Sequence, residues 1–163
     1  MSENKTHVII SPHPDDECIG CYEILLNKKK IIIIYTEDCD QNRREEAMEL
    51  KNKANIDIKA QLFLKNVPPN LLNKDSVLYF PDPSYEIHPA HRKVGSQGEE
   101  LLRKGLDVIF YNTIMNSPYI HEVEIPEQKE QLLNKVYPSQ KSLWEYDKKY
   151  VLFEGYCSWI MKI

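Results

Sequence analysis

Short apolar runs alternate with helical patterns along the first half of the chain. His7–Ile10 is a short apolar strand, and Ile31–Tyr35 is β-branched and apolar throughout, which is typical of a strand buried on both faces of a parallel sheet. Between and after them, Cys18–Asn27 carries apolar residues at helical spacing, and Arg43–Ala54 is rich in good helix formers. The pattern therefore predicts strands and helices in alternation.

The rest of the chain continues this alternation less regularly. It predicts strands over Gln61–Leu64, Val77–Phe80 and Asp107–Tyr111, helices over Gln97–Lys104 and Ile125–Tyr137, and strand character over Tyr150–Ile160. Strands that alternate with helices form βαβ units, so we expect an α/β fold with a mainly parallel sheet. No boundary of a second domain is visible, and residues 1–163 are expected to form a single compact domain.

Composition and charge fit one globular domain and argue against several classes of protein. The 163 residues carry a formal net charge of -4, whereas a general nucleic-acid binder needs a basic surface. The longest apolar run is far too short to cross a bilayer, so we expect no membrane span. Residues Met1–Thr6 lack the apolar core of a signal peptide, and the 4 cysteines are irregularly spaced, so we expect a cytoplasmic protein with reduced thiols.

Two clusters of polar residues are notable for their positions. Ser11–Glu17, with the sequence SPHPDDE, directly follows the first predicted strand, and α/β sheets bind ligands at the carboxyl ends of their strands. One of its two consecutive aspartates can bind a metal while the other faces a metal-bound water. His88–His91, with the sequence HPAH, fits the start of a helix, where residues three apart share a face and both imidazoles can point into one cavity.

These residue types together suit a catalytic metal site. Two histidines and one carboxylate leave an open position on a tetrahedral zinc ion, as in catalytic rather than structural sites. Such an ion lowers the pKa of bound water to about 7, and a neighbouring carboxylate can take the proton as the water attacks a carbonyl. A second imidazole can stabilise the oxyanion and protonate a leaving amine. The set is therefore suited to the hydrolysis of an amide.

With these two clusters the sequence resembles the PIG-L/LmbE-like family of zinc-dependent N-deacetylases. Tyr35-Thr36, Arg43–Ala47 (RREEA) and the late segment that begins at His121 and ends in Ser139-Gln140 are also similar to the family. Its members remove acetyl groups from N-acetylglucosamine units attached to lipids, to small thiols or their precursors, and to oligosaccharides. The resemblance implies a Rossmann-like three-layer sandwich and a zinc-dependent N-deacetylase acting on an N-acetylglucosamine-type sugar or glycoconjugate.

The resemblance also implies a role for each residue of the two clusters. His13, Asp16 and His91 would hold the zinc ion, and another divalent ion such as Fe²⁺ could use the same ligands. Asp15 would be the general base while the zinc-bound water attacks the amide carbonyl. His88 would be the second catalytic group, on the opposite side of that carbonyl.

Arg43 matches the arginine with which the family reaches its substrate, and its fork of donors suits sugar hydroxyls or phosphate. The expected partner is a small acetylated amino sugar or glycoconjugate and not a nucleic acid, and the resemblance permits oligomerisation. Which acetylated molecule is the substrate does not follow from the sequence.

The sequence departs from the family pattern in two places, one within the second cluster and one between the two clusters. Ala90 stands where the family usually has an aspartate that orients the first imidazole through a hydrogen bond, so Asp82 or Glu86 is a candidate to replace that carboxylate. The segment between Leu64 and Val77 is short, so we expect an abbreviated crossover instead of a full helix.

Three other functions stay open. A degenerate deacetylase that binds sugar or regulates without catalysis would explain Ala90. A receiver-like signalling domain also has an acidic pair after its first strand, but Lys65 and Asn66 follow the third predicted strand, where that class needs a phosphoacceptor aspartate. Cys18 and Cys21 have the C-x-x-C spacing of redox motifs, although their place on the first helix favours packing.

Overall fold

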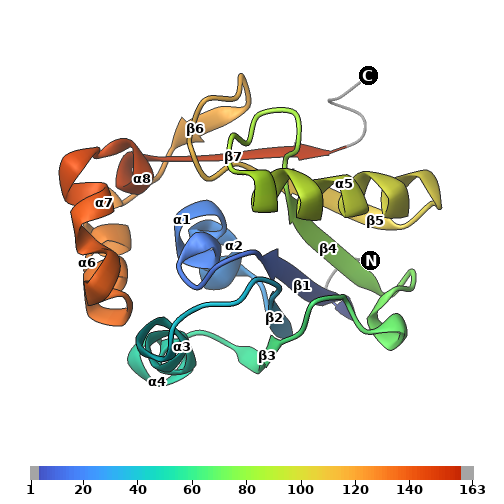
Figure 1. The fold of residues 1–163 in the computed structure, drawn as a ribbon, viewed down its shortest axis with the longest axis horizontal. Helices are drawn as coiled ribbons and strands as arrows, with labels where there is room; N and C mark the ends of the chain where they lie inside the picture. The colour runs from blue at the N-terminus through green and yellow to red at the C-terminus, as the bar shows by residue number, and fades with distance from the viewer. Residues whose placement is uncertain (1–3, 159–163) are drawn as a thin grey trace.

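A twisted sheet of seven strands forms the centre of the described part of the chain, residues 4–158, in the computed structural model (Figure 1). The strands are β1 (Thr6–Ser11), β2 (Ile31–Tyr35), β3 (Ile58–Phe63), β4 (Ser76–Pro81), β5 (Asp107–Tyr111), β6 (Ile120–Glu122) and β7 (Phe153–Ser158). Their order is β3-β2-β1-β4-β5-β7-β6, with β1 to β5 parallel and β7 antiparallel to β5 and β6. The protein is therefore a compact α/β domain with a mixed, mostly parallel sheet.

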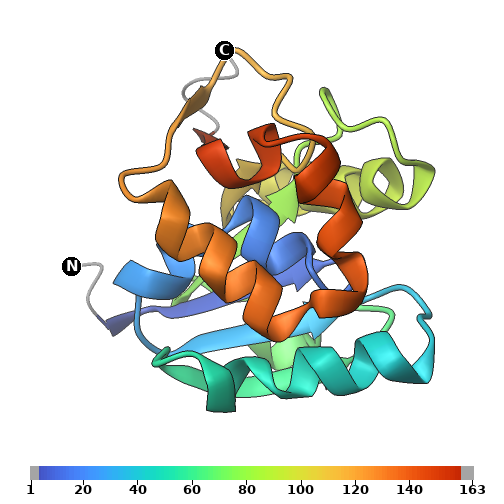
Figure 2. The same cartoon turned by 90° about the vertical axis from the view of Figure 1, so that its left-hand side faces the viewer.

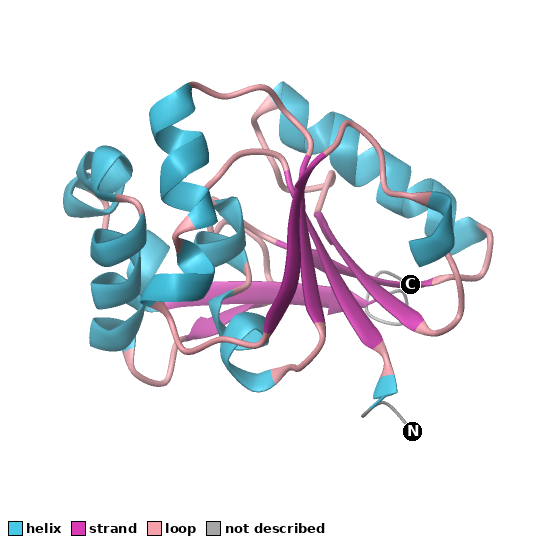
Figure 3. Ribbon diagram, turned by 90° about the horizontal axis from the view of Figure 1, so that it is seen from below, coloured by secondary structure: helices cyan, strands magenta, loops and turns pink. Residues whose placement is uncertain are grey.

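Helices pack on both faces of this sheet (Figure 3). They are α1 (Asp16–Gly20), α2 (Tyr22–Asn27), α3 (Gln41–Met48), α4 (Leu50–Lys53), α5 (Pro89–Arg103), α6 (Pro126–Val136), α7 (Lys141–Tyr146) and α8 (Lys149–Leu152), with 3₁₀ turns at Pro69–Leu71 and Pro138–Gln140. Helix α5 packs on one face and most of the others on the opposite one, where α6 packs against α1 (Figure 2). Within the described residues, no helix combines the length and apolar character that a membrane crossing needs.

The central strands are apolar on both sides because both of their faces are covered. Val8 and Ile10 of β1 contribute to the core beneath α5, whereas Ile9 points into the core on the opposite face. All three are fully buried, as expected for alternating side chains in a strand between two layers of helices. The prediction of a buried parallel sheet is therefore confirmed.

Several predicted elements have different ends in the structure. The predicted helix Gln97–Lys104 is the second half of α5, which begins at Pro89 and so includes the second histidine cluster. Two glycines let this helix approach the sheet: a Cβ at Gly98 would meet the Phe80 ring, and one at Gly95 would meet the Pro81 carbonyl oxygen. Close packing of α5 on β4 therefore fixes the position of the histidines at its start.

The predicted helix Cys18–Asn27 is wrong as a single element, because it breaks at Cys21 into α1 and α2. The buried Glu154 carboxylate, from β7, accepts hydrogen bonds from the backbone N–H groups of Tyr22 and Glu23. These N–H groups lie at the start of α2, where they have no partner within the helix. A contact from the other end of the chain therefore begins the second helix.

The remaining predictions are confirmed with small corrections. Strand β5 has the predicted bounds, α6 begins at Pro126, one residue after the predicted start, and β3 starts three residues before the predicted strand, at Ile58. The predicted helix Arg43–Ala54 begins two residues earlier, at Gln41, and is divided at Glu49 into α3 and α4. The crossover from β3 to β4 holds only a short 3₁₀ turn, as the short segment indicated. In Tyr150–Ile160 the first residues are helical, in α8, before β7 begins; the predicted end of that strand lies outside the described residues.

Candidate metal centre

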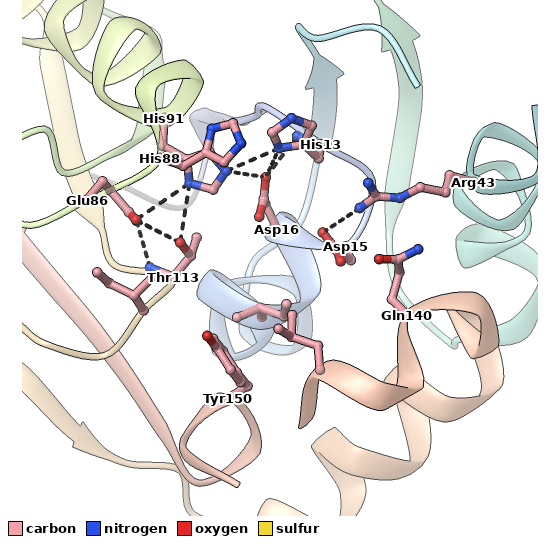
Figure 4. Close-up of a pocket in the computed structure, with 13 residues that line it drawn as sticks. His13, Asp15, Asp16, Arg43, Glu86, His88, His91, Thr113, Gln140 and Tyr150 are labelled. Atoms are coloured by element: carbon pink, nitrogen blue, oxygen red, sulfur yellow. Dashed lines mark hydrogen bonds and ion pairs between the residues drawn. The ribbon is translucent and has the colours of Figure 1, made fainter. Parts of the chain in front are cut away.

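The loops that follow β1, β4 and β5 meet at the carboxyl edge of the sheet and enclose a cavity of ≈ 300 Å³ (Figure 4). Its polar lining consists of the residues His13, Asp15, Asp16, Arg43, Glu86, His88, His91, Thr113 and Gln140, and its apolar lining of Ile19, Ile114, Leu143 and Tyr150. All six site residues predicted from the sequence line this one cavity. Its position is the one at which open α/β sheets bind ligands.

Three of the predicted residues bring their donor atoms to one point. The Asp16 Oδ2 atom lies 3.4 Å from His13 Nδ1 and 3.1 Å from His91 Nε2, and the two imidazole nitrogens are 3.2 Å apart. Bond lengths of about 2.0–2.1 Å to a tetrahedral zinc ion require donor atoms about 3.3 Å apart. This set of two nitrogens and one carboxylate oxygen therefore matches one face of a zinc tetrahedron, with the fourth position left open.

The turn that carries Asp15 and Asp16 has an unusual backbone. Asp15 has a φ of 116°, a region in which residues other than glycine are uncommon. The Glu17 carboxylate stabilises this conformation because it accepts hydrogen bonds from the Asp15 N–H, at 3.0 Å, and from the Ser11 hydroxyl, at 3.1 Å. The Asp16 Oδ2 atom accepts a further bond from the His13 N–H at 2.8 Å, so the two ligands on this turn also hold each other in place.

Glu17 is itself fixed by groups far away in the sequence. It is fully buried, and the hydroxyls of Tyr35 and Tyr137 both donate to its Oε1 atom. Burial raises the pKa of Glu17, while these hydrogen bonds partly oppose the increase. The last acidic residue of the SPHPDDE cluster is therefore a buried anchor for the turn rather than a group of the cavity.

Asp15 is buried next to Arg43. Its Oδ1 atom lies 3.2 Å from the Arg43 Nη2 atom, which also donates to the Pro14 carbonyl at 2.7 Å. Burial and the neighbouring Asp16 charge raise the pKa of Asp15 well above its ordinary value, although the Arg43 guanidinium opposes the increase. Asp15 is thus a stronger base than an exposed carboxylate, as a general base near neutral pH requires.

His88 caps the N-terminus of α5, as the sequence indicated. Its Nδ1 atom accepts a hydrogen bond from the Ala90 N–H at 3.2 Å, and its ring centroid lies 5.0 Å from that of His13 and 5.2 Å from that of His91. Partial burial and the charges of His91 and His13 lower its pKa, so neutral imidazole is favoured. With Nδ1 as an acceptor, the proton of the neutral ring is on Nε2.

His91 and Asp16 form a buried ion pair when no metal separates them. Burial disfavours the charged imidazole, but the carboxylates of Asp16 and Glu86 outweigh this effect and raise the pKa of His91 to about 10. Burial also opposes the charge on Asp16, yet the imidazoles of His91 and His13 hold its pKa well below the usual range. A cation that binds here must therefore displace a proton from His91.

Glu86, one of the two candidates to replace the carboxylate missing at Ala90, lies elsewhere than expected. Glu86 contacts the imidazole of His91 rather than that of His88: its Oε2 atom is 3.5 Å from His91 Nδ1. Thr113, which sequence reasoning missed, binds Glu86 through its N–H and its hydroxyl. Thr113 lies two residues after the predicted strand Asp107–Tyr111, so its place at a strand end was the signal that could have identified it.

A second group of possible ligands lies away from the cavity. Glu23, His121 and Glu154 approach one another near the start of α2. Their polar atoms already have partners, because His121 Nε2 lies 2.6 Å from Glu23 Oε1, and the buried Lys129 Nζ lies 3.6 Å from Glu154 Oε1. This group is therefore explained as a set of polar contacts that joins β6, β7 and α6 to α2.

The thiols of Cys18 and Cys21 are reduced and fully buried, and burial raises the pKa of both well above the ordinary value. A reactive redox thiol has the opposite properties, being accessible and low in pKa. We expect a thiol reagent at neutral pH to modify at most one cysteine of the folded protein, the partly exposed Cys39, and all 4 after denaturation. Cys39→Ser should abolish the modification of the folded protein. Two modified thiols in the folded protein, both lost in Cys18→Ser, would instead support a redox function.

The cavity thus unites residues from both motifs and from helix α3. The metal-ligand set comes from the turn after β1 and from the first turn of α5, and the flanking groups Asp15 and His88 belong to the same two segments. No protein-family model and no curated protein matches the sequence. Inferences about function therefore depend on this geometry and on the motifs themselves.

Proposed function

We propose that this protein is a metal-dependent hydrolase that removes the N-acetyl group from an N-acetylglucosamine-type sugar or glycoconjugate. The observation that carries the proposal is the tetrahedral spacing of three donor atoms, 3.1–3.4 Å apart, with a buried carboxylate and an exposed imidazole beside them. The proposal includes a Rossmann-like three-layer sandwich as its fold. It also includes PIG-L/LmbE-like ancestry, for which the two histidine motifs are the support.

His13, Asp16 and His91 would hold the ion. The mixed nitrogen and oxygen ligands favour zinc, and Fe²⁺ is an alternative with the same ligands. When bound, the ion would polarise the amide carbonyl and make water more acidic. The remaining chemistry falls to the side chains around it.

Asp15 and His88 have separate roles in the reaction. The Asp15 carboxylate, more basic than usual because of burial and the Asp16 charge, takes the proton of the attacking water. The Nε2 proton of His88 is directed away from the backbone, because Nδ1 is occupied by the Ala90 N–H. His88 can therefore donate a hydrogen bond from Nε2 to the oxyanion that forms at the carbonyl. The proton that Asp15 took from the water passes to the nitrogen of the leaving amine as the C–N bond breaks, and the products are acetate and a free amino sugar.

Arg43 supports substrate recognition in this proposal. It lines the cavity from α3, and its Nε atom is buried with no hydrogen-bond partner among the described residues. Gln140, from the segment similar to the family's Ser-Gln, lines the cavity near Arg43 (Figure 4). Donors of this kind suit the hydroxyls of a sugar ring.

The test measures metal content and acetate release on the same purified protein. We expect one equivalent of zinc per chain, and equal amounts of acetate and free amine from N-acetylglucosamine or one of its glycoconjugates. Chelated protein should lose this activity and regain it on addition of zinc. A protein that binds no divalent ion at neutral pH would exclude the proposal.

The alternative is a noncatalytic sugar-binding or regulatory domain with the same fold. The observation that favours it is Ala90, because the Glu86 carboxylate contacts His91 and so does not replace the carboxylate that would orient His88 and keep its imidazole protonated. Zinc binding together with saturable sugar binding, and no acetate release from any acetylated sugar tested, would support this alternative.

A further inference from the structure

A buried carboxylate and a hydroxyl lie behind the imidazole of His91, on the side away from Asp16. The Glu86 side chain is fully buried, and its Oε1 atom accepts a hydrogen bond from the Thr113 N–H at 2.8 Å. The Thr113 hydroxyl lies 2.9 Å from Oε1 and 2.8 Å from Oε2 of Glu86, and 3.3 Å from His91 Nδ1. Both groups therefore face the same nitrogen of the imidazole (Figure 4).

The arrangement determines which nitrogen of His91 keeps its proton when a metal ion binds. A threonine hydroxyl has one proton, and because it donates to the Glu86 carboxylate, its lone pair is left to accept from His91 Nδ1–H. With this proton kept on Nδ1, a metal ion that displaces the other proton of the ring takes the lone pair of Nε2. Nε2 is the atom that lies 3.1 Å from Asp16 Oδ2 and 3.2 Å from His13 Nδ1. The nitrogen that loses its proton thus faces the candidate metal position.

The loop that carries Glu86 is held in place independently of any metal. The Asp82 carbonyl accepts from the Glu86 N–H at 3.0 Å, and the Asp82 N–H donates to the Tyr111 carbonyl at 2.8 Å. The Asn116 side chain donates to the Tyr85 carbonyl at 2.9 Å. The ends of β4 and β5 are thereby joined, and Glu86 and Thr113 meet at this junction.

We propose that Glu86 and Thr113 are a pair of positioning residues that fix His91 as a metal ligand. The Glu86 carboxylate therefore supports a metal ligand rather than His88. The inference rests on the metal centre of the proposed function. Carboxylates bonded to the outer nitrogen of a ligating histidine fix its tautomer and orientation, and their loss weakens metal binding about 10- to 100-fold. Here the carboxylate comes five residues before the ligand, on the loop, instead of from the position of Ala90 on the helix.

Equilibrium binding of zinc, and the visible spectrum of the cobalt(II)-loaded protein, test the pair without any need for catalysis. We expect Glu86→Gln and Thr113→Val to raise the Kd for zinc about 10- to 100-fold and to change the cobalt spectrum. Thr113→Ser, which keeps the hydroxyl, should bind zinc within about twofold of the original protein.

The matched control is Tyr79→Phe, which removes another buried hydroxyl beside an imidazole. The Tyr79 hydroxyl lies 2.8 Å from His7 Nδ1 at the amino end of β1, remote from the cavity. Its loss should leave the zinc Kd and the cobalt spectrum as they were. The contrast separates a specific effect on His91 from a general effect of buried hydroxyls on stability.

Folded Glu86→Gln and Thr113→Val proteins with the original zinc Kd and cobalt spectrum would overturn the inference and leave the proposed function intact. Weakened metal binding together with an absence of acetate release in the original protein would support the pair and refute the deacetylase. An original protein that binds neither zinc nor cobalt would refute both.

Discussion

Asp15→Asn is expected to lower kcat/KM for the deacetylation of an N-acetylglucosamine substrate about 10³-fold while zinc stays bound. A positioned general base contributes about 10²–10⁴-fold, and asparagine cannot accept the proton of the attacking water. The carboxylate of Asp15 is not among the three donor atoms that converge on the ion position. Acetate release and metal content, measured on the same preparation, check both parts of the prediction.

Asparagine is the suitable replacement because of the backbone at this position. Its φ of 116° lies in a region that asparagine tolerates better than most residues other than glycine, so alanine would add strain. The fold raises the pKa of Asp15, mainly through burial and the Asp16 charge, so the charged carboxylate destabilises the metal-free fold at neutral pH. The variant should therefore unfold at the same or a higher temperature than the original protein.

Glu17→Gln serves as the comparison for this variant. Glu17 is buried beneath the same turn but does not line the cavity, so its loss should lower stability, and with it activity, through the turn. A thermal midpoint that falls in Glu17→Gln but not in Asp15→Asn would separate support of the turn from base catalysis. More than a tenth of the original kcat/KM in zinc-loaded Asp15→Asn would contradict the role of Asp15 as the base.

The parallel sheet could be predicted because both of its faces are buried. Runs such as Ile31–Tyr35 are apolar on both sides of the strand, and this leaves a pattern that is readable within a few residues. The break at Cys21 could not be predicted, because the carboxylate that begins α2 belongs to Glu154, more than a hundred residues later in the chain. Helix boundaries set by such tertiary contacts leave no local signal.

In the site, too, some residues could be placed from the local sequence, whereas others depend on contacts between distant segments. The motif that contains His13 and Asp16 could be placed at a strand end from its position alone, and the structure brings His91 to it across the sheet. The role of Glu86 could not be assigned in the same way, because its partner Thr113 lies 27 residues further on in another loop. Sequence spacing identifies ligands on one turn or one helix, but the groups that orient them come from wherever the sheet places its loops.

Zinc binding should tighten about tenfold for each pH unit between about pH 6.5 and 9, because the ion must displace the proton that His91 carries in the metal-free protein. Burial opposes this protonation, but Asp16 and Glu86 raise the pKa of His91 to about 10, so the imidazole is charged over the whole interval. Isothermal titration calorimetry in buffers of different ionisation enthalpy should show about one proton released per zinc bound. Asp16→Asn should abolish binding in the micromolar range, since it removes the one anionic ligand.

The stability of the metal-free protein should have the opposite pH dependence. The pKa of His91 is about 10 in the folded state, above the value of about 6.5 expected for an unfolded chain. The ion pair with Asp16 and Glu86 therefore contributes fully below about pH 6.5, and its contribution is lost as the pH rises through about 10. The melting temperature of the metal-free protein should fall as the pH rises across this interval. The increase in melting temperature that zinc produces should grow over the same interval. Zinc affinity that does not change with pH, or apo stability that increases with it, would mean that His91 is not the protonated partner of Asp16 at this site.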